Sequence, residues 1–304
     1  MTMHFGIFRG AVLMAAIGMG GCATLFEPAA TPETQDATKQ AELTMTRADA
    51  ALRQGDLDRA LFEYVNVLSL DEDKADAHYM VGVIHYLKGN LGLAMRAFQK
   101  TLSITKDHAG ALEGIGLVLL RDKKPEEAKA YLGKALAADE HRWRAHNGLG
   151  VIADLNHDYA AAEQHYQAAL RERPETPMLL TNLGYSKYAA GDWAGAQSYF
   201  ERALEINPRH EKAWSNLGLL HVRRGSYGKA MDAFTRIMPE SRASNSVGYL
   251  CLMDGKYRQA EEYFVEAIKQ SPAYYAEAHD NLQKAKALAY QSAGREFDDL
   301  LECR

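Results

Sequence analysis

Small and large apolar residues recur along this chain with a period of 34 residues. A frame that starts at Ala41 gives further units, without a gap, at Ala75, Ala109, Trp143, Pro177 and Glu211. A seventh unit starts at Ser241. A fixed period of this length is typical of an array of helix-turn-helix units, each of which buries its apolar face against its neighbours. The pattern predicts seven such units over residues 41–274.

Three places in each unit hold residues of constant size. The eighth place is small: Ala48, Gly82, Gly116, Gly150, Gly184, Gly218 and Gly248. The twentieth is always alanine: Ala60, Ala94, Ala128, Ala162, Ala196, Ala230 and Ala260. The twenty-fourth is large: Tyr64, Phe98, Leu132, Tyr166, Phe200, Phe234 and Phe264. We interpret the small residues as the point where two helices cross most closely, with the large side chain filling the remaining space.

Turn residues separate the two helices of each unit. The first helix is predicted to stop at a glycine in five units, at Gly55, Gly89, Gly191, Gly225 and Gly255. Glycine suits the left-handed backbone that ends many helices. The predicted N-caps that follow are Asp56, Asn90, Asp158, Asp192 and Ser226. Pro125 stands at the start of a second helix, where proline is tolerated.

Seven units in register resemble the tetratricopeptide repeat. Residues 181–185 and 213–218, Thr-Asn-Leu-Gly-Tyr and Ala-Trp-Ser-Asn-Leu-Gly, are similar to the family consensus. The resemblance implies an all-α, right-handed superhelix (an α-solenoid) whose concave face is lined by the first helices. Residues 275–304 are then expected to form a capping helix, through Leu282 and Leu288, and an acidic, mobile tail from 293.

The sixth unit is shorter than the others, running 30 residues from Glu211 to Ser241 (241 − 211), with Pro239 near its end. Proline would end the second helix about one turn early. One interpretation is a harmless trimming of a connection, which repeat arrays tolerate. The other is a local change of stacking angle that divides the groove in two.

The first 21 residues resemble a bacterial lipoprotein signal peptide. An apolar stretch from Ala11 to Met19 is too short to span a bilayer and has the length of a signal-peptide core. It ends in Met-Gly-Gly-Cys, which is similar to a lipobox and makes Cys22 the expected lipidation site. Cleavage after Ala23 in an ordinarily secreted protein is the alternative. Residues 22–40 are expected to be a flexible tether.

The residue after the lipobox cysteine is Ala23, not the aspartate that retains lipoproteins at the inner membrane. By resemblance to Gram-negative lipoproteins, this implies a lipid anchor on the periplasmic face of the outer membrane. Acyl chains add about 0.8 kcal/mol of membrane affinity per buried CH₂ group.

The composition and the motifs argue against catalysis and nucleic-acid binding. The net charge is −5, and there is no basic stripe to neutralise phosphates. We find no Walker motif, Gly-x-Ser-x-Gly or His-Glu-x-x-His sequence, so no enzyme, cofactor or metal site is predicted. Cys251 is expected to be a small buried residue. The alternative is a disulfide between Cys251 and Cys303, which an oxidising periplasm would allow.

Protein or peptide binding in the concave groove is the expected activity, because repeat arrays present extended concave surfaces. The second, fifth, ninth and twelfth places of the first helices supply the candidate residues. They are Tyr79, Val83, Tyr86, Leu117, Leu120, Arg144, Asn147, Asp154, Tyr185, Tyr188, Leu219, Asn245 and Tyr249. Tyrosines on such a face can stack on a bound peptide. Alternatively, some of them pack against the neighbouring repeat.

The layout of lipobox, tether and repeats resembles the repeat lipoproteins of pilus machines. The last unit, from Asn245 to Tyr275, together with residues 278–282, is similar to Tad (Flp) pilus assembly lipoproteins. That resemblance implies a periplasmic scaffold that supports a secretin channel, with other envelope proteins as partners. A type IV pilotin or an adaptor for cell-wall hydrolases is the alternative of the same class. An enzyme subunit is the alternative of another class, and no motif supports it.

Overall fold

The computed structural model describes residues 32–302, and these residues form fifteen α-helices and no strand. The first eight helices are α1 (Pro32–Arg53), α2 (Leu57–Leu70), α3 (Ala75–Leu87), α4 (Leu91–Ile104), α5 (Ala109–Arg121), α6 (Pro125–Ala138), α7 (Trp143–Leu155) and α8 (Tyr159–Glu172). The others are α9 (Pro177–Ala189), α10 (Trp193–Ile206), α11 (Glu211–Arg223), α12 (Tyr227–Phe234), α13 (Glu240–Met253), α14 (Tyr257–Gln270) and α15 (Ala276–Glu302). The predicted all-α fold is confirmed.

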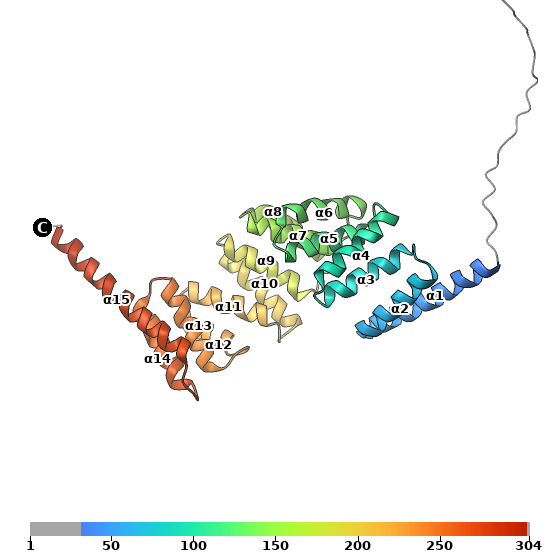
Figure 1. Ribbon diagram of the computed structural model, residues 1–304. Coiled ribbons are helices and arrows are strands. Elements are labelled where there is room, and N and C mark those ends of the chain that lie inside the picture. Colours follow the sequence, from blue (N-terminus) through green and yellow to red (C-terminus); the bar gives the residue numbers. More distant parts are fainter. Residues whose placement is uncertain (1–31, 303–304) are drawn as a thin grey trace, which may run out of the picture.

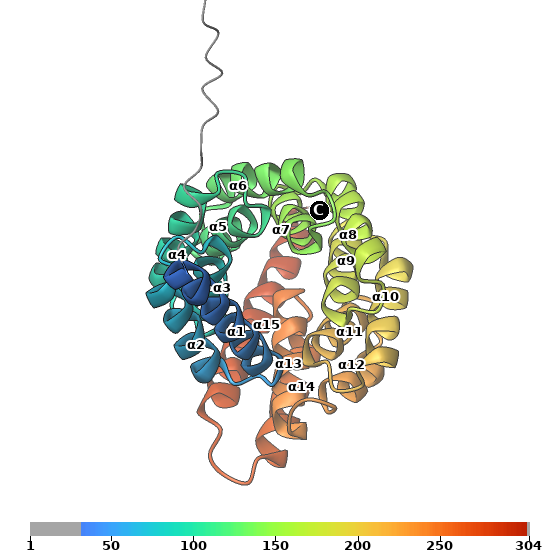
Figure 2. The ribbon, with the colours of Figure 1, turned by 90° about the vertical axis from the view of Figure 1, so that its right-hand side faces the viewer.

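The helices pair as the repeat predicts and stack into a curved solenoid (Figure 1). Five first helices, α3, α5, α7, α9 and α11, begin at the first residue of their 34-residue unit. Viewed along the stack, the odd-numbered helices from α3 to α13 lie on the inner side of the curve (Figure 2). The even-numbered helices lie on the outer side. The inner face is therefore built from the first helix of each repeat.

The close crossing of the two helices depends on the small eighth residue. A Cβ atom built on Gly150 of α7 would lie 2.6 Å from Cε1 of Tyr166 on α8, closer than real Cβ atoms come. Tyr166 is 1% exposed, and its hydroxyl donates a hydrogen bond to Asp154 Oδ2 at 2.7 Å. Ala162, in the twentieth place, is fully buried beside this contact. The constant residue sizes in the sequence thus have a direct steric cause.

Both ends of the array differ from the expected boundaries. Helix α1 begins at Pro32, so residues 32–40 of the expected tether are helical. Proline fits the first turn of a helix, because its backbone is already close to the helical conformation and the N–H that it lacks has no partner there. Helix α15 continues to Glu302, so the tail expected from 293 onward is helical as well. The remainder of the expected tether and the signal peptide lie outside the described residues.

The sixth repeat has a short second helix. Helix α12 has 8 residues and ends at Phe234, whereas the other second helices have 14. Irregular turns follow, and Pro239 is the N-cap residue of α13. After these turns α13 still lies on the inner side of the stack, so the solenoid continues through the seventh repeat (Figure 2).

Helix α15 packs on the last repeat in the position that the first helix of an eighth repeat would occupy. Ala278 and Ala285 are fully buried, and Leu282 joins the core formed with Phe264. Asn281 Nδ2 donates a hydrogen bond to Asn245 Oδ1 at 3.2 Å. The same side-chain contact joins Asn182 of α9 to Asn147 of α7, at 2.8 Å. The helix thus covers the apolar end of the array.

Candidate functional site

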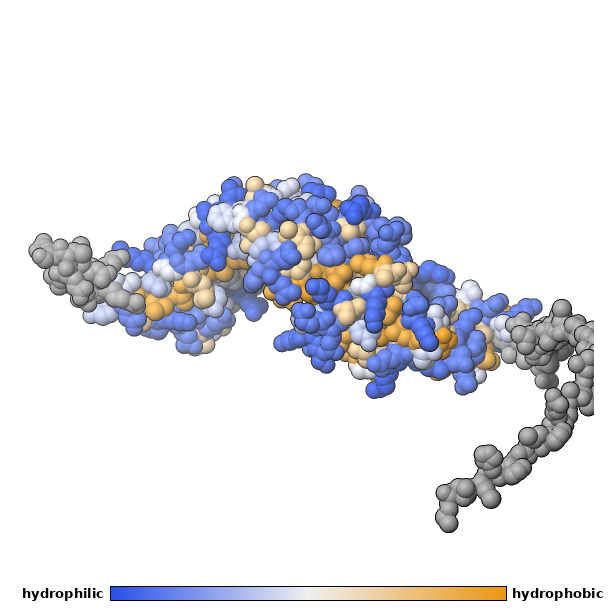
Figure 3. All heavy atoms as spheres, turned by 90° about the horizontal axis from the view of Figure 1, so that it is seen from above, coloured by the Kyte–Doolittle hydropathy of each residue, from blue (hydrophilic) through white to orange (hydrophobic). Residues whose placement is uncertain are grey.

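The inner face has two separate hollows, and seven of the thirteen expected groove residues line them. The first hollow is a cavity of about 140 Å³ between α3 and α5, and the second is a more open space of about 590 Å³ between α7, α9 and α11. Seen from above Figure 1, apolar residues form a band through the middle of the molecule with hydrophilic residues on both sides (Figure 3).

Aromatic and aliphatic side chains line the first hollow. Of the expected groove residues, the structure brings five together here: Tyr79, Val83, Tyr86, Leu117 and Arg144. The floor is the ring of Phe98 from α4, which the sequence had placed in the core. A Cβ built on Gly114 would lie 2.5 Å from that ring, so α5 sits directly on it.

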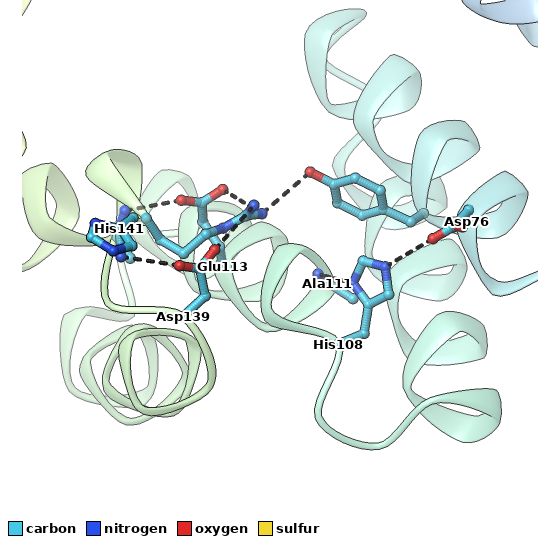
Figure 4. A network of polar contacts seen from close by, with 9 residues as sticks. Asp76, His108, Ala111, Glu113, Asp139 and His141 are labelled. Carbon is cyan, nitrogen blue, oxygen red and sulfur yellow. Dashed lines mark hydrogen bonds and ion pairs between the residues drawn. The ribbon is translucent and has the colours of Figure 1, made fainter. Parts of the chain in front are cut away.

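A network of polar residues forms one wall of the first hollow and joins three repeats (Figure 4). Glu113 of α5 is 5% exposed, and its Oε1 accepts a hydrogen bond from the Ala145 backbone N–H at 3.1 Å. Its Oε2 lies 3.2 Å from Arg142 Nη2. That guanidinium also lies 3.5 Å from the Tyr79 hydroxyl and within 4.0 Å of Asp139. Arg142 therefore holds the start of α7 against both α5 and α3.

The charge state of Glu113 reflects two opposing effects. Burial raises the pKa of its carboxyl, and this exceeds the lowering by Arg142 and Arg144. At the start of α5, His108 accepts the Ala111 backbone N–H as a helix cap and lies 3.5 Å from Asp76 of α3. Helices α5 and α7 are thus each tied at the N-terminus to the preceding repeat.

The second hollow has a more polar lining. Asp154 and Tyr185 are the expected groove residues found there, together with Asn182, Lys212 and Asn216. Burial raises the pKa of Asp154, although hydrogen bonds from Ser186 and Tyr166 lower it. Lys212 is exposed at the edge. The space can accept hydrogen bonds, donate them and stack an aromatic ring.

Six expected groove residues line neither hollow: Leu120, Asn147, Tyr188, Leu219, Asn245 and Tyr249. Asn245 is 6% exposed, and its amide donates to Glu277 Oε1 of α15 at 3.3 Å. Leu120 packs toward Gly148 of the next repeat. Helix packing therefore uses part of the face that we expected to be free.

The sequence left open whether the groove tyrosines face a ligand or pack against the neighbouring repeat, and the structure has examples of buried and of exposed rings. Tyr79 contacts Phe98 and His108, with ring centroids 6.0 and 4.8 Å away, and so packs within the array. Tyr185 and Tyr249 are 45% and 46% exposed and remain available for a ligand.

The sequence did not single out Arg142, which contacts Glu113 beside the first hollow, or Asn182 and Asn216, which line the second hollow. Arg142 precedes α7, outside the helix positions that were considered. Asn182 and Asn216 occupy the sixth place of their units, beside the chosen fifth place. Their recurrence at one repeat position was the signal that could have found them.

Cys251 is fully buried in the core of the last repeat, and burial raises the pKa of its thiol. Cys303 and the lipidation candidate Cys22 lie outside the described residues. Within residues 32–302, no group of three or more His, Cys, Asp or Glu side chains could hold a metal ion. No helix in that range is long and apolar enough to cross a bilayer.

Comparison with known proteins identifies the repeat. The tetratricopeptide-repeat profile matches residues 45–111, 113–177 and 181–245. The chain belongs to the tetratricopeptide-repeat family. The matched segments cover the inner helices that form both hollows.

Among its relatives are proteins of pilus assembly. The type IV pilus assembly protein PilF of Pseudomonas aeruginosa is 25% identical over 183 residues, 58% of this chain and 72% of PilF. A structure of PilF aligns with a TM-score of 0.53 at 18% identity, over 84% of this chain and 99% of that one. PilW, described as a type IV pilus biogenesis factor, aligns with a TM-score of 0.52 at 22% identity, over 80% and 98%. These two structural likenesses show the fold.

A second kind of relative matches over a shorter region. The cellulose synthase 1 operon protein C of Komagataeibacter xylinus is 35% identical over 115 residues, or 36% of this chain. The aligned region is 8% of that protein's length. This match reflects the repeat and leaves the rest of the larger protein without a counterpart here.

Proposed function

We propose that this protein is a scaffold that binds a segment of another protein on its inner face, within a pilus assembly machine of the cell envelope. The observation that carries the proposal is the pair of hollows on one side of the solenoid. The two hollows combine an apolar cavity, the exposed ring of Tyr185 and solvent-exposed polar groups such as that of Lys212. Concave surfaces of repeat arrays commonly take extended partners in this way.

The envelope assignment rests on the N-terminal sequence and on the relatives. Lipidation at Cys22 would hold the array on the periplasmic face of the outer membrane. Residues 23–31 would connect the lipid to α1, and the helical start at Pro32 makes this tether shorter than the sequence suggested. The scaffold role, rather than catalysis, agrees with the interaction module to which the chain belongs.

The machine that we propose is the Tad (Flp) pilus, because the last repeat and residues 278–282 resemble the assembly lipoprotein TadD. Its partner there would be the secretin or a subunit beside it. The second candidate is a pilotin of a type IV pilus, which the similarity to PilF favours. Neighbouring genes for a secretin, a pilus ATPase and a prepilin peptidase of one type would distinguish the two machines.

Site-specific photo-crosslinking in the producing cells tests the proposal. A photoreactive phenylalanine at Tyr185 replaces one exposed aromatic ring with another and should crosslink to the secretin or another envelope subunit. The matched control places the same group at Gln167, exposed on the outer helix α8. Equal crosslinking from both positions, or none from position 185 to an envelope protein, would sink the groove proposal.

The anchor needs a separate measurement. Cys22→Ser should move the protein from the membrane fraction to the periplasmic fraction. Unchanged fractionation would rule out lipidation at this residue and leave the groove result untouched.

A further inference from the structure

The lining and the size of the first hollow indicate which kind of side chain a partner would insert there. Its lining is apolar, and its volume of about 140 Å³ suits a single branched or aromatic side chain rather than a stretch of chain. The hydroxyl of Tyr79 is turned to Arg142, so the cavity presents the rings and methyl groups of Tyr79, Val83 and Leu117. An anchor residue entering here would be desolvated, as hot-spot residues of interfaces are.

Two arginines near this cavity form no ion pair with a carboxylate that the structure describes. Arg144 lines the hollow and stacks on Trp143, with Cζ 4.3 Å from the ring centroid. Arg121 stacks on Tyr86, at 5.1 Å, and donates to the Tyr86 backbone oxygen. Both are exposed, and neither forms an ion pair with a carboxylate among the side chains that the structure describes.

The one acid in the lining does not neutralise these charges. Both oxygens of Glu113 are already engaged, by the Ala145 N–H and by Arg142. Arg144 is close enough to Glu113 to lower the pKa of its carboxyl, but neither Arg144 nor Arg121, which lies over Tyr86 at the border of the hollow, forms an ion pair with a carboxylate of the described residues. An occupant that brings carboxylates would form charge-assisted, bidentate hydrogen bonds with these two arginines, which is the geometry that arginine favours.

We infer that the hollow between α3 and α5 is a specificity site for an acidic protein segment that inserts one bulky apolar side chain. Carboxylates next to the anchor pair with Arg144 and Arg121, and the anchor lies on Phe98 between Tyr79 and Leu117. This inference rests on the proposed groove function and specifies its ligand. The downstream hollow, with Asn182 and Lys212, then receives the more polar continuation of the segment.

Selection from a random dodecapeptide display library on the full chain, purified in detergent, tests the inference. Wild-type protein should enrich peptides with Leu, Ile, Met or Phe beside Asp or Glu. The double variant Arg121→Glu/Arg144→Glu should enrich basic flanks instead. Its affinity for a selected acidic peptide should fall at least about tenfold. The control Arg209→Glu changes charge on an exposed turn outside both hollows and should keep the wild-type preference.

A second variant examines the anchor. Val83→Phe places a ring inside the cavity and should remove the preference for a large apolar residue while the acidic preference remains, with helical circular dichroism confirming the fold. Enriched peptides without the acidic-apolar pattern, or a pattern unchanged in both variants, would overturn the inference and leave groove binding standing. If no peptide is enriched, the inference is overturned, and crosslinking from position 185 decides whether groove binding survives.

Discussion

Arg142 Nη2 lies 3.2 Å from Oε2 of Glu113, a carboxylate whose side chain is 6% exposed. The pair connects the start of α7 to the middle of α5, and the Tyr79 hydroxyl brings α3 into the same network. A charge buried this deeply is stabilised only while its partner is present. The Arg142–Glu113 ion pair therefore has two roles: it borders the first hollow, and it holds three repeats together.

Removing the arginine should cost far more stability than neutralising both partners. Arg142→Met leaves the Glu113 carboxylate buried and unpaired, which we expect to lower the free energy of unfolding by roughly 3 kcal/mol at pH 7. Adding Glu113→Gln should recover part of this loss, since the amide oxygen still accepts the Ala145 N–H. Urea unfolding of both single variants and the double variant measures the coupling. Additive losses would show that the pair does not act as a unit.

Acid should rescue the same variant. Burial already raises the pKa of Glu113, and removal of Arg142 raises it further. The folded state then binds a proton more tightly than the unfolded state, so stability rises as the pH falls toward the unfolded-state pKa near 4.5. Arg142→Met should therefore lose less stability, relative to wild type, at pH 5 than at pH 7. A constant difference would contradict the buried charge.

The glycine at the helix crossing gives a third prediction. Gly150→Ala forces the ring of Tyr166 to move, and we expect a loss of about 1–3 kcal/mol in the free energy of unfolding. Gly133→Ala is the matched control, because Gly133 lies in α6 with open space around its Cβ position. Alanine is the better helix former, so the control should gain about 0.5–1 kcal/mol. Thermal or urea unfolding separates the two effects.

Most of the fold could be predicted from the sizes of the residues at fixed places in the repeat. A small eighth residue against a large twenty-fourth residue is a steric requirement, repeated seven times, and it located the starts of α3, α5, α7, α9 and α11. The start of α1 was missed because residues 32–40 precede the first 34-residue unit, so the repeat pattern carries no signal there. A local preference for helix, with proline in the first turn, determines that boundary.

The candidate site was only partly predictable because neighbouring repeats decide which inner residues stay free. Asn245 has the same repeat position as other groove residues, yet α15 covers it. Arg142 belongs to a connection between helices, and its role depends on the burial of Glu113 one repeat earlier. Such relationships join residues about 30 positions apart and have no local sequence pattern.

The two repeats without a glycine stop offer a fourth prediction. Lys123 and His157 occupy the left-handed region with φ of 60° and 58°, where the other five repeats have glycine. A side chain there costs about 1–2 kcal/mol, partly offset by the greater freedom of glycine in the unfolded chain. Lys123→Gly should therefore stabilise the protein by about 0.5–1 kcal/mol in urea unfolding. Gly89→Ala, the reverse change at an equivalent turn, should destabilise it.

A histidine pair between the two helices of the fourth repeat should make the array sensitive to acid. His146 Nδ1 lies 3.2 Å from His165 Nδ1, a distance at which one neutral ring donates to the other. Burial is the largest cause that lowers the pKa of both rings. For His146 it outweighs a hydrogen bond with the Glu140 backbone, which raises the pKa, and Arg171 lowers the pKa further. For His165 the charges of His146 and Lys129 add to the lowering. Both histidines are therefore neutral in the folded protein at pH 7.

The sign of the effect follows from these lowered values. The unfolded chain protonates its histidines near pH 6.5, while the folded protein resists, so stability is lost as the pH falls from about 6.5 toward the folded-state pKa. His165→Gln should flatten this loss in urea unfolding at pH 7.5, 6.5 and 5.5. His141→Gln is the opposite control, since Glu172 raises the pKa of His141. Its favourable contribution is present at low pH, and removing it should steepen the acid loss; equal profiles for both variants would contradict the pairing.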